Sequence, residues 1–216
     1  IGVGAIVGSL IALKVKMTSI PEMVALFNGF GGLATFFIAW SEFNSVPENT
    51  FQYVLIMLTT YIGGVTFSGS IVAYGKLSEK LKIQKTSIIT KLFTTVFYVS
   101  LVFLLYTILI TPTLIPNFEF FTVLLVLTLL GGIGFVIPIG GGDMPVVISL
   151  LNSFSGIAAA FAGLLLLNNV LIVAGSLVGA SGLILTVIMA KAMNRSIGNI
   201  LFVGYASSTS GAKSEE

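Results

Sequence analysis

The 216-residue chain contains no cysteine and no histidine, and only 8% of its residues are charged. Without cysteine it forms no disulfide and has no thiolate chemistry, and without histidine it has no imidazole metal ligand or proton relay of its own. Soluble domains carry roughly 25% charged residues. Hydrophobic residues make up 56% of this chain, and its mean hydropathy is +1.10. The composition therefore predicts a polytopic membrane protein.

Apolar stretches of about twenty residues, the length that crosses ~30 Å of hydrocarbon, recur along the whole sequence. They predict seven spans, at about 1–13, 21–40, 51–74, 87–111, 118–139, 145–167 and 170–190, the first one shortened because the sequence begins inside it. No stretch alternates like a barrel strand, so the predicted fold is an all-α transmembrane bundle over residues 1–195. Residues 196–216 become rich in serine and glycine, which predicts a linker towards a further soluble domain.

The distribution of charge predicts how the spans cross the membrane. The ten basic residues all fall on one side of the predicted topology: Lys14, Lys16, Lys76, Lys80, Lys82, Lys85, Lys91, Lys191, Arg195 and Lys213. The loops on the other side hold Glu42, Glu48 and Glu119 and no base. Because basic loops stay on the cytoplasmic or matrix side, we expect the N-terminus outside and the C-terminus inside.

Two segments of the chain repeat each other. PEMVALFNGFGGLATFF at 21–37 aligns without a gap to PVVISLLNSFSGIAAAF at 145–161. Both predicted helices start on the inner side, each with a proline in its first turn and an acid beside it, Glu22 or Asp143, which complements the helix dipole. The repeat places Asn28 and Asn152 roughly 10 Å along their helices. This pattern is typical of two parallel halves related by an axis along the membrane normal.

Small hydroxyl residues are expected at a similar depth. Ser70 lies near the inner end of its span, and Ser149 lies one turn before Asn152. Together with the two asparagines they would bind and orient water without holding charge, which suits a hydrated path closed by small motions. The alternative is that these asparagines only join helices, through hydrogen bonds typically worth ~1 kcal/mol or less. No acid or lysine lies at the centre of a span, so a titrating group would have to come from elsewhere.

Several longer motifs resemble one family. GGDMPVVISLLNSFSGIAAAFAG, NNVLIVAGSLVGASGLILTVIMAKAMNRS, IPEMVALFNGFGG and VTFSGSIVAYGKL are similar to the membrane domain of the β subunit of proton-translocating NAD(P) transhydrogenase. The resemblance covers nearly the whole chain. It implies an enzyme that couples inward proton movement to hydride transfer from NADH to NADP+. NAD(H) and NADP(H) would bind to soluble domains outside this chain, which itself would bind no cofactor, metal or nucleic acid.

The resemblance also implies partners and a location. The chain would work with the α subunit, which supplies membrane helices and the NAD(H)-binding domain, and with its own C-terminal NADP(H)-binding domain. The assembly would be a homodimer of αβ units in a bacterial inner membrane or, alternatively, a mitochondrial inner membrane. Family β subunits have two further helices before the region that is similar to this chain.

Residue by residue, Asn28 matches a position where several members carry a proton-binding histidine. Members with asparagine there resemble a variant in which a partner helix supplies the histidine, so Asn28 would line the path. Ser70 and Asn152 match the family's channel-lining serine and asparagine. Three charged positions match those that meet the NADP(H) domain at the inner face: Asp143, Lys191 and Arg195. Setting the topology and extending towards the headgroups would also explain Lys191.

A different function stays open from the residues themselves. Two parallel helical repeats are also the architecture of secondary transporters, in which one half rocks against the other. An independent transporter would move a solute without a soluble partner. A purely structural interpretation treats both asparagines as joints between helices.

Overall fold

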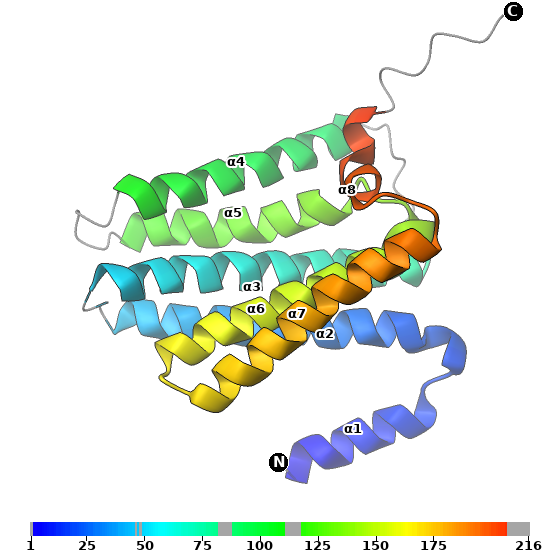
Figure 1. Ribbon diagram of the computed structural model, residues 1–216, viewed down its shortest axis with the longest axis horizontal. Coiled ribbons are helices and arrows are strands. Elements are labelled where there is room, and N and C mark those ends of the chain that lie inside the picture. The colour runs from blue at the N-terminus through cyan, green and yellow to red at the C-terminus, as the bar shows by residue number, and fades with distance from the viewer. Residues whose placement is uncertain (1, 46, 48, 82–87, 111–117, 207–216) are drawn as a thin grey trace, which may run out of the picture.

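The computed structural model describes residues 2–45, 47, 49–81, 88–110 and 118–206, and within them every regular element is helical (Figure 1). The elements, in chain order, are α1 (Gly2–Lys14), the 3-10 turn η1 (Met17–Ser19), α2 (Ile20–Asn44), α3 (Thr50–Leu77), α4 (Ile88–Ile110), α5 (Phe118–Val136), the 3-10 turn η3 (Gly141–Asp143), α6 (Met144–Leu165), α7 (Asn169–Ala192) and α8 (Ile197–Ala206). The prediction of an all-α bundle is confirmed.

Six of these helical segments are long and apolar enough to cross a membrane: Met17–Asn44, Thr50–Leu77, Lys91–Leu109, Phe118–Val136, Gly141–Leu165 and Asn169–Ala192. They correspond to the second to seventh predicted spans. The first predicted span is α1, a helix of 13 residues, which rises about 20 Å and is shorter than the ~30 Å hydrocarbon core. No residue of α1 is buried in the chain.

The repeat seen in the sequence is also a repeat of local structure. A 3-10 turn leads directly into α2 and another leads into α6, and each helix has its proline, Pro21 or Pro145, in the first turn. Proline fits there because the first helical N–H groups have no intrahelical acceptor. Other helices start with asparagine caps instead. Asn49 Oδ1 accepts from Gln52 N at 2.8 Å, and Asn168 Oδ1 accepts from Leu171 N at 3.1 Å.

Helix α3 is the centre of the bundle and contacts α2, α5 and α6 (Figure 1). In its membrane-spanning window 72% of the residues are buried, against 17% for α4 and 22% for α7. Those two outer helices instead expose large apolar side chains, such as Val102 on α4 and Ile184 on α7. Exposed apolar faces on long helices are suited to lipid contact, and the fold makes this a membrane protein.

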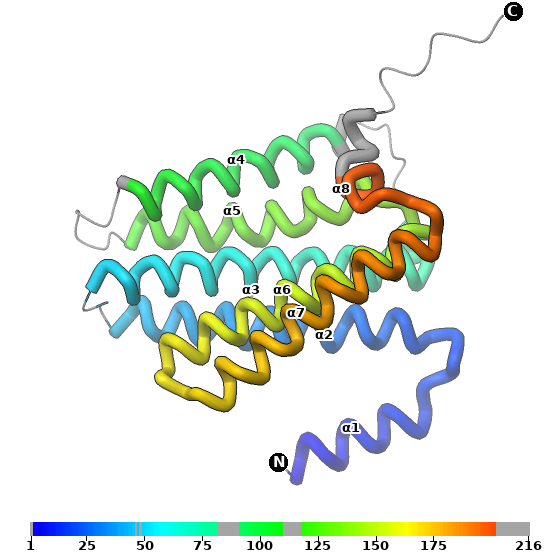
Figure 2. The backbone as a smooth tube through the Cα atoms, in the orientation of Figure 1, coloured from blue at the N-terminus to red at the C-terminus, as the bar shows by residue number. Residues whose placement is uncertain are grey.

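The helices alternate in direction, so their basic ends lie at the same end of the bundle. Lys14, Lys76 and Lys191 each occupy the last turn of their helix, and Figure 2 shows the ends of α1, α3 and α7 on the same side. We call this the basic end. The side of the membrane that it faces stays a prediction from charge, and Glu48, Lys82, Lys85 and Lys213 lie outside the described residues.

Helices approach each other closely where both carry glycine. A Cβ on Gly156 of α6 would lie 2.4 Å from the backbone N of Gly179 on α7. On α2, a Cβ on Gly32 would lie 2.8 Å from the carbonyl oxygen of Gly63 on α3. Such approaches need small residues, because lipid provides no hydrophobic force that drives helices together.

The segment predicted as a linker begins with a helix. After Ser196, whose hydroxyl accepts from Asn199 N at 3.1 Å, α8 runs over Ile197–Ala206. Its Ile200 is 1% exposed and belongs to the apolar cluster at the basic end. The first residues of the tail are thus packed onto the bundle, and 207–216 lie outside the described residues.

Candidate functional site

A hydrogen-bonded group of three polar side chains joins α2, α3 and α6 inside the bundle. Asn28 Nδ2 donates to Ser70 Oγ at 3.1 Å, and Ser155 Oγ donates to Asn28 Oδ1 at 2.7 Å. Asn28 is 8% exposed and Ser70 is fully buried. We call these three residues the polar cluster. The sequence predicted the proximity of Asn28 and Ser70 but not the part played by Ser155.

The backbone around the polar cluster allows the three helices to meet. Gly29 follows Asn28, and a Cβ at Gly29 would lie 3.1 Å from Ser70 Cβ. A Cβ at Gly31 would lie 4.0 Å from Ser155 Cβ, an ordinary van der Waals distance. In the repeat alignment Gly31 and Ser155 occupy equivalent positions, so the two repeated helices touch through the same part of the motif.

The Ser155 hydroxyl has a choice of acceptors. Its Oγ lies 2.7 Å from Asn28 Oδ1 and 3.0 Å from the carbonyl oxygen of Asn152. A serine has one hydroxyl proton, so it donates to one acceptor at a time. When Ser155 turns to its own helix, the amide oxygen of Asn28 becomes available to another donor such as water. The polar cluster holds no group that titrates near neutral pH, so it can orient water and protons in transit but cannot store a charge.

Apolar side chains close the polar cluster on both sides along the bundle. Towards the basic end lies a buried cluster that we call the basic-end layer: Ala25, Val72, Ala73, Val136, Ile137, Ile139, Met144, Val146, Val147, Ile148, Leu151, Ala190 and Ile200. Towards the opposite end lies a second one, which includes Phe36, Val65 and Phe121. A dry apolar layer stops water and ions until it opens. The polar cluster is therefore closed off along the bundle axis but stays partly exposed at Ser155, which is half-buried.

Ser149 lies on a different side of α6 from the polar cluster. Its Oγ donates to the carbonyl oxygen of Gly182 at 3.2 Å and accepts from Thr186 Oγ1 at 3.2 Å. One turn further, Ser153 Oγ donates to the carbonyl oxygen of Gly179 at 2.6 Å. These bonds make an α6–α7 seam. The structure thus brings Ser149 to α7 and does not bring it to Asn28.

Asn152 is half-buried and lies three residues before Ser155, on the same face of α6. Its carbonyl oxygen accepts from Ser155, but its side-chain amide has no hydrogen bond to another described residue. The two repeated asparagines are therefore not equivalent. Asn28 is the centre of the polar cluster, and Asn152 lies beside it, one turn nearer the basic end.

The charged residues predicted at the inner face gather at the basic end. Asp143 is buried and lies 3.7 Å from Nε of Arg195, whose side chain is 46% exposed. Lys191 lines a shallow groove with Arg195 next to the start of α8. Glu22 is half-buried in the first turn of α2. The structure therefore joins Asp143 to Arg195 and leaves Lys191 at the surface.

Lys76 is a residue whose role the sequence did not reveal beyond its charge. Its Nζ donates to the carbonyl oxygens of Val136 at 3.1 Å and Ile139 at 2.7 Å, and also to that of Ile137. The Val136 carbonyl ends α5, and those of Ile137 and Ile139 lie in the turn beyond it, where carbonyls no longer have an intrahelical N–H partner. Lys76 therefore holds the end of α5 and the turn that leads to Asp143. A lysine at a helix end gives no signal in sequence that its partner is another helix.

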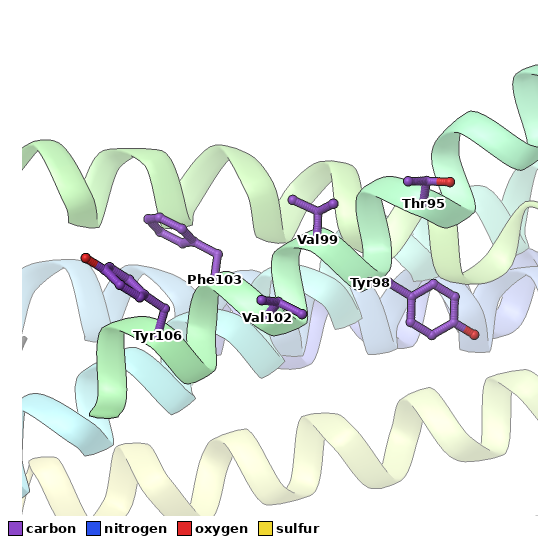
Figure 3. A pocket seen from close by; sticks show the side chains of 6 residues that line it. All are labelled: Thr95, Tyr98, Val99, Val102, Phe103 and Tyr106. Atoms are coloured by element: carbon purple, nitrogen blue, oxygen red, sulfur yellow. The ribbon is translucent and has the colours of Figure 1, made fainter. Parts of the chain in front are cut away.

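A further hollow of the surface lies away from this site. A groove on the outward face of α4 is lined by Thr95, Tyr98, Val99, Val102, Phe103 and Tyr106 (Figure 3). Its lining is mostly apolar, and lipid or a neighbouring helix would cover such a face in a membrane. Within the described residues no group of three or more acidic, histidine or cysteine side chains could hold a metal.

Comparison with known proteins shows the family of this chain. The NAD(P) transhydrogenase beta subunit family matches residues 1–216. This chain belongs to that family. Two sequences of NAD(P) transhydrogenase subunit beta from Rhodospirillum rubrum are each 39% identical over 217 aligned residues, which cover 96% of this chain. The resemblance seen in the sequence motifs is confirmed.

The aligned region is 46% of each of these relatives, so the chain spans about half of their length. Dinucleotides bind at the loop between a strand and a helix in parallel sheets, and the described part of this chain has no strand. The described residues therefore contain no strand–loop–helix unit of the kind at which parallel sheets bind dinucleotides.

Proposed function

We propose that this chain is the proton-conducting membrane part of an NAD(P) transhydrogenase. Inward proton movement through it would drive hydride transfer from NADH to NADP+ on soluble domains that bind NAD(H) and NADP(H). The observation that carries the proposal is the polar cluster. The other buried polar side chains of the described helices are serines and threonines, with Asp143 at the basic end. Asn28 is a buried amide bonded to hydroxyls from two other helices, and intramembrane polar groups mark pathways.

Coupling requires that a gate prefer different states when NADP+ or NADPH is bound, since without differential affinity nothing is driven. The basic-end layer is suited to be this gate. Ile200 of α8 belongs to it, and α8 leads out of the bundle towards the predicted NADP(H)-binding domain. A movement of that domain would be transmitted through α8 to the layer that closes the polar cluster. The Asp143–Arg195 contact lies on the same route, next to α8.

The proton-binding group would come from a partner. The polar cluster has no titratable side chain, and the chain has no histidine. A membrane helix of the α subunit placed beside Asn28 would supply it, as the family resemblance implies. The complete assembly would be a homodimer of αβ units. Its location would be a bacterial plasma membrane, with the basic end on the cytoplasmic side, and the bacterial relatives favour this over a mitochondrial membrane.

The test uses the complete enzyme in liposomes with a trapped pH dye, so that NADPH formation and internal pH are followed together. Asn28→Leu keeps the approximate volume but removes both hydrogen bonds of the amide. We expect proton-coupled turnover to fall about 100-fold, because two hydroxyls lose a buried partner and the route for water is broken. Asn44→Leu is the matched control, since Asn44 is exposed and, among the described residues, its amide donates to the carbonyl of Trp40, on its own helix.

Asn152→Ala is measured in the same assay. Its side chain is half-buried, and we expect a smaller loss, about tenfold. Equal coupling in wild type and Asn28→Leu would contradict the proposed path. Turnover in the wild type without any pH change would contradict proton pumping itself. Flux of a solute through this chain without soluble domains would instead support an independent transporter.

A further inference from the structure

Helix α3 buries five serine and threonine hydroxyls, and two of them bond to their own helix. Thr59 Oγ1 donates to the carbonyl oxygen of Leu55 at 2.7 Å, and Ser68 Oγ donates to that of Gly64 at 3.0 Å. This bond to the preceding turn is the usual solution for serine and threonine inside a helix. Ser70 instead accepts from Asn28 of α2, and the other two have no partner within the described part of the chain. Thr60 Oγ1 and Thr66 Oγ1 are fully buried and have no hydrogen-bond partner among the described residues.

Thr66 is the one that lies next to the polar cluster. It precedes Ser70 by four residues, so the two share a face of α3 and are about 6 Å apart along the axis. That face meets α2, because a Cβ on Gly32 would lie 2.9 Å from Thr66 Cβ. Thr66 is therefore one turn further from the basic end than Ser70, on the same contact between α2 and α3.

Further polar atoms continue along this contact. The carbonyl oxygen of Gly63 lies 2.8 Å from the position of a Cβ on Gly32, and the hydroxyl of Thr35 lies 2.8 Å from that of a Cβ on Gly63. The absent glycine side chains thus leave backbone carbonyls and hydroxyls close together where α2 crosses α3. Water in a protein interior needs two to four polar partners. At this crossing the Thr35 hydroxyl already donates to the carbonyl oxygen of Gly32 at 2.9 Å. The Thr66 hydroxyl is the unpaired group, the Gly63 carbonyl oxygen and Thr66 Cβ both lie within 3 Å of the position of a Cβ on Gly32, and the polar cluster is one turn away.

An unpaired buried hydroxyl is costly in an apolar interior, by about 1–3 kcal/mol by general experience with proteins. A valine at position 66 would fill nearly the same volume without that cost. We propose that Thr66 binds water and extends the proton path from the polar cluster towards the end of the bundle opposite the basic end. The proposal rests on the proposed function and adds the part of the route that Asn28, Ser70 and Ser155 do not reach.

The experiment compares Thr66→Val with Thr66→Ser and Thr60→Val in the complete enzyme in liposomes. Thr60 is the matched control. It is an unpaired, fully buried threonine of the same helix, but it lies four residues before Gly64, which faces Thr128 of α5. We expect Thr66→Val to slow proton-coupled turnover about fivefold to tenfold, the rate cost of losing one hydrogen bond. Thr66→Ser and Thr60→Val should stay within about twofold of wild type.

Thermal unfolding distinguishes the path from packing. Loss of an unpaired hydroxyl raises or preserves the midpoint, so Thr66→Val should be slower in turnover without being less stable. Wild-type turnover in Thr66→Val, equal slowing by Thr60→Val, or failure of Thr66→Ser to restore the rate would each overturn the role of Thr66. Thr66→Ala decides the matter if the valine variant does not assemble. A wild type that moves no protons would refute the proposed function. Any of the three outcomes above, found while the wild type stays coupled, refutes the extension alone.

Discussion

The two sides of α6 carry the same kind of side chain but use it differently. Ser153 donates to the carbonyl oxygen of Gly179 on α7, and Ser155, two residues later, donates to the side-chain amide of Asn28 on α2. A carbonyl acceptor is fixed by the backbone of its helix. An amide on a side chain can turn and bond to water instead. The α6–α7 seam is therefore suited to hold helices together, and the polar cluster is suited to exchange partners.

The glycines sharpen this difference. Where α6 meets α7, a Cβ on Gly156 would lie 2.4 Å from Gly179 N and 2.9 Å from the carbonyl oxygen of Gly175. Next to the polar cluster, a Cβ on Gly31 would meet nothing closer than 4.0 Å. The contact between α6 and α7 leaves no room for the helices to shift, and the contact between α6 and α2 at Gly31 does. We conclude that tight packing is concentrated on the structural side of α6.

The largest expected effect comes from forcing the α6–α7 seam apart. Gly156→Val adds atoms where backbone already lies within 3 Å, and we expect it to lower the free energy of unfolding by about 3 kcal/mol. Thermal denaturation of the purified complex measures this. Turnover per folded molecule should be unchanged. Gly8→Val is the control, because no atom of the chain lies within 4 Å of a Cβ there. A stable Gly156→Val variant that has lost coupling would contradict the assignment of a structural role to the α6–α7 seam.

Lys76 tests whether carbonyl acceptors indicate a structural role elsewhere. Lys76→Met keeps the apolar stem but withdraws the charged donor from the carbonyls at the end of α5, and we expect a loss of about 2 kcal/mol in the free energy of unfolding. Chemical denaturation in detergent measures it. Lys76→Arg should recover part of this stability. If Lys76→Met left stability intact and abolished coupling, a bond to a backbone carbonyl would not indicate a structural role, and the contrast with bonds to a side-chain amide would be wrong.

Ser149 decides between the interpretation from sequence and that from structure. The sequence predicted it in the water path, and the structure places it in the α6–α7 seam with Thr186 and Gly182. We expect Ser149→Ala to cost about 1 kcal/mol of stability and to leave proton-coupled turnover unchanged, measured in the liposome assay. A tenfold loss of turnover at full stability would instead support the prediction from sequence that Ser149 lines the water path.

The smallest effect on stability is expected from the charged pair at the basic end. Arg195 is 46% exposed and lies 3.7 Å from Asp143, so Arg195→Gln should change the free energy of unfolding by about 1 kcal/mol or less. Because added salt screens such pairs, the difference from wild type should shrink between low and high ionic strength. A loss of several kcal/mol would show that the pair is an essential part of the fold. An effect confined to coupling would support its place on the route to α8.

Much of the fold could be predicted because membrane helices are recognised in a sequence by their length and their apolar composition. The starts of α2 and α6 followed from Pro21 and Pro145, and the shared depth of Asn28 and Ser70 followed from counting residues along two antiparallel helices. Depth depends only on distance along each helix, which a sequence contains. The helix over Ile197–Ala206 was not predicted, because the serine and glycine after Ala206 dominated the composition of the tail.

The neighbours of each side chain were harder to predict. Ser149 and Ser155 lie on the same helix, but one faces α7 and the other faces α2. Periodicity gives the angle between two side chains around a helix but not which helix packs against each face. Ser155 was missed for this reason, although it follows Asn152 by three residues in NSFSG. The unpaired hydroxyl of Thr66 could not be found from sequence either, since pairing depends on the rotamer and the helix opposite.

The central claim is that the two sides of α6 differ in function, and the matched pair Ser155→Ala and Ser153→Ala tests it most directly. Each variant removes one buried or half-buried hydroxyl, two residues apart, and is measured for proton uptake per NADPH formed and for thermal unfolding in the same complete enzyme. The account predicts that Ser155→Ala slows coupled turnover about tenfold with little loss of stability, while Ser153→Ala loses about 1 kcal/mol of stability and stays coupled. Equal effects of the two substitutions on turnover would contradict it.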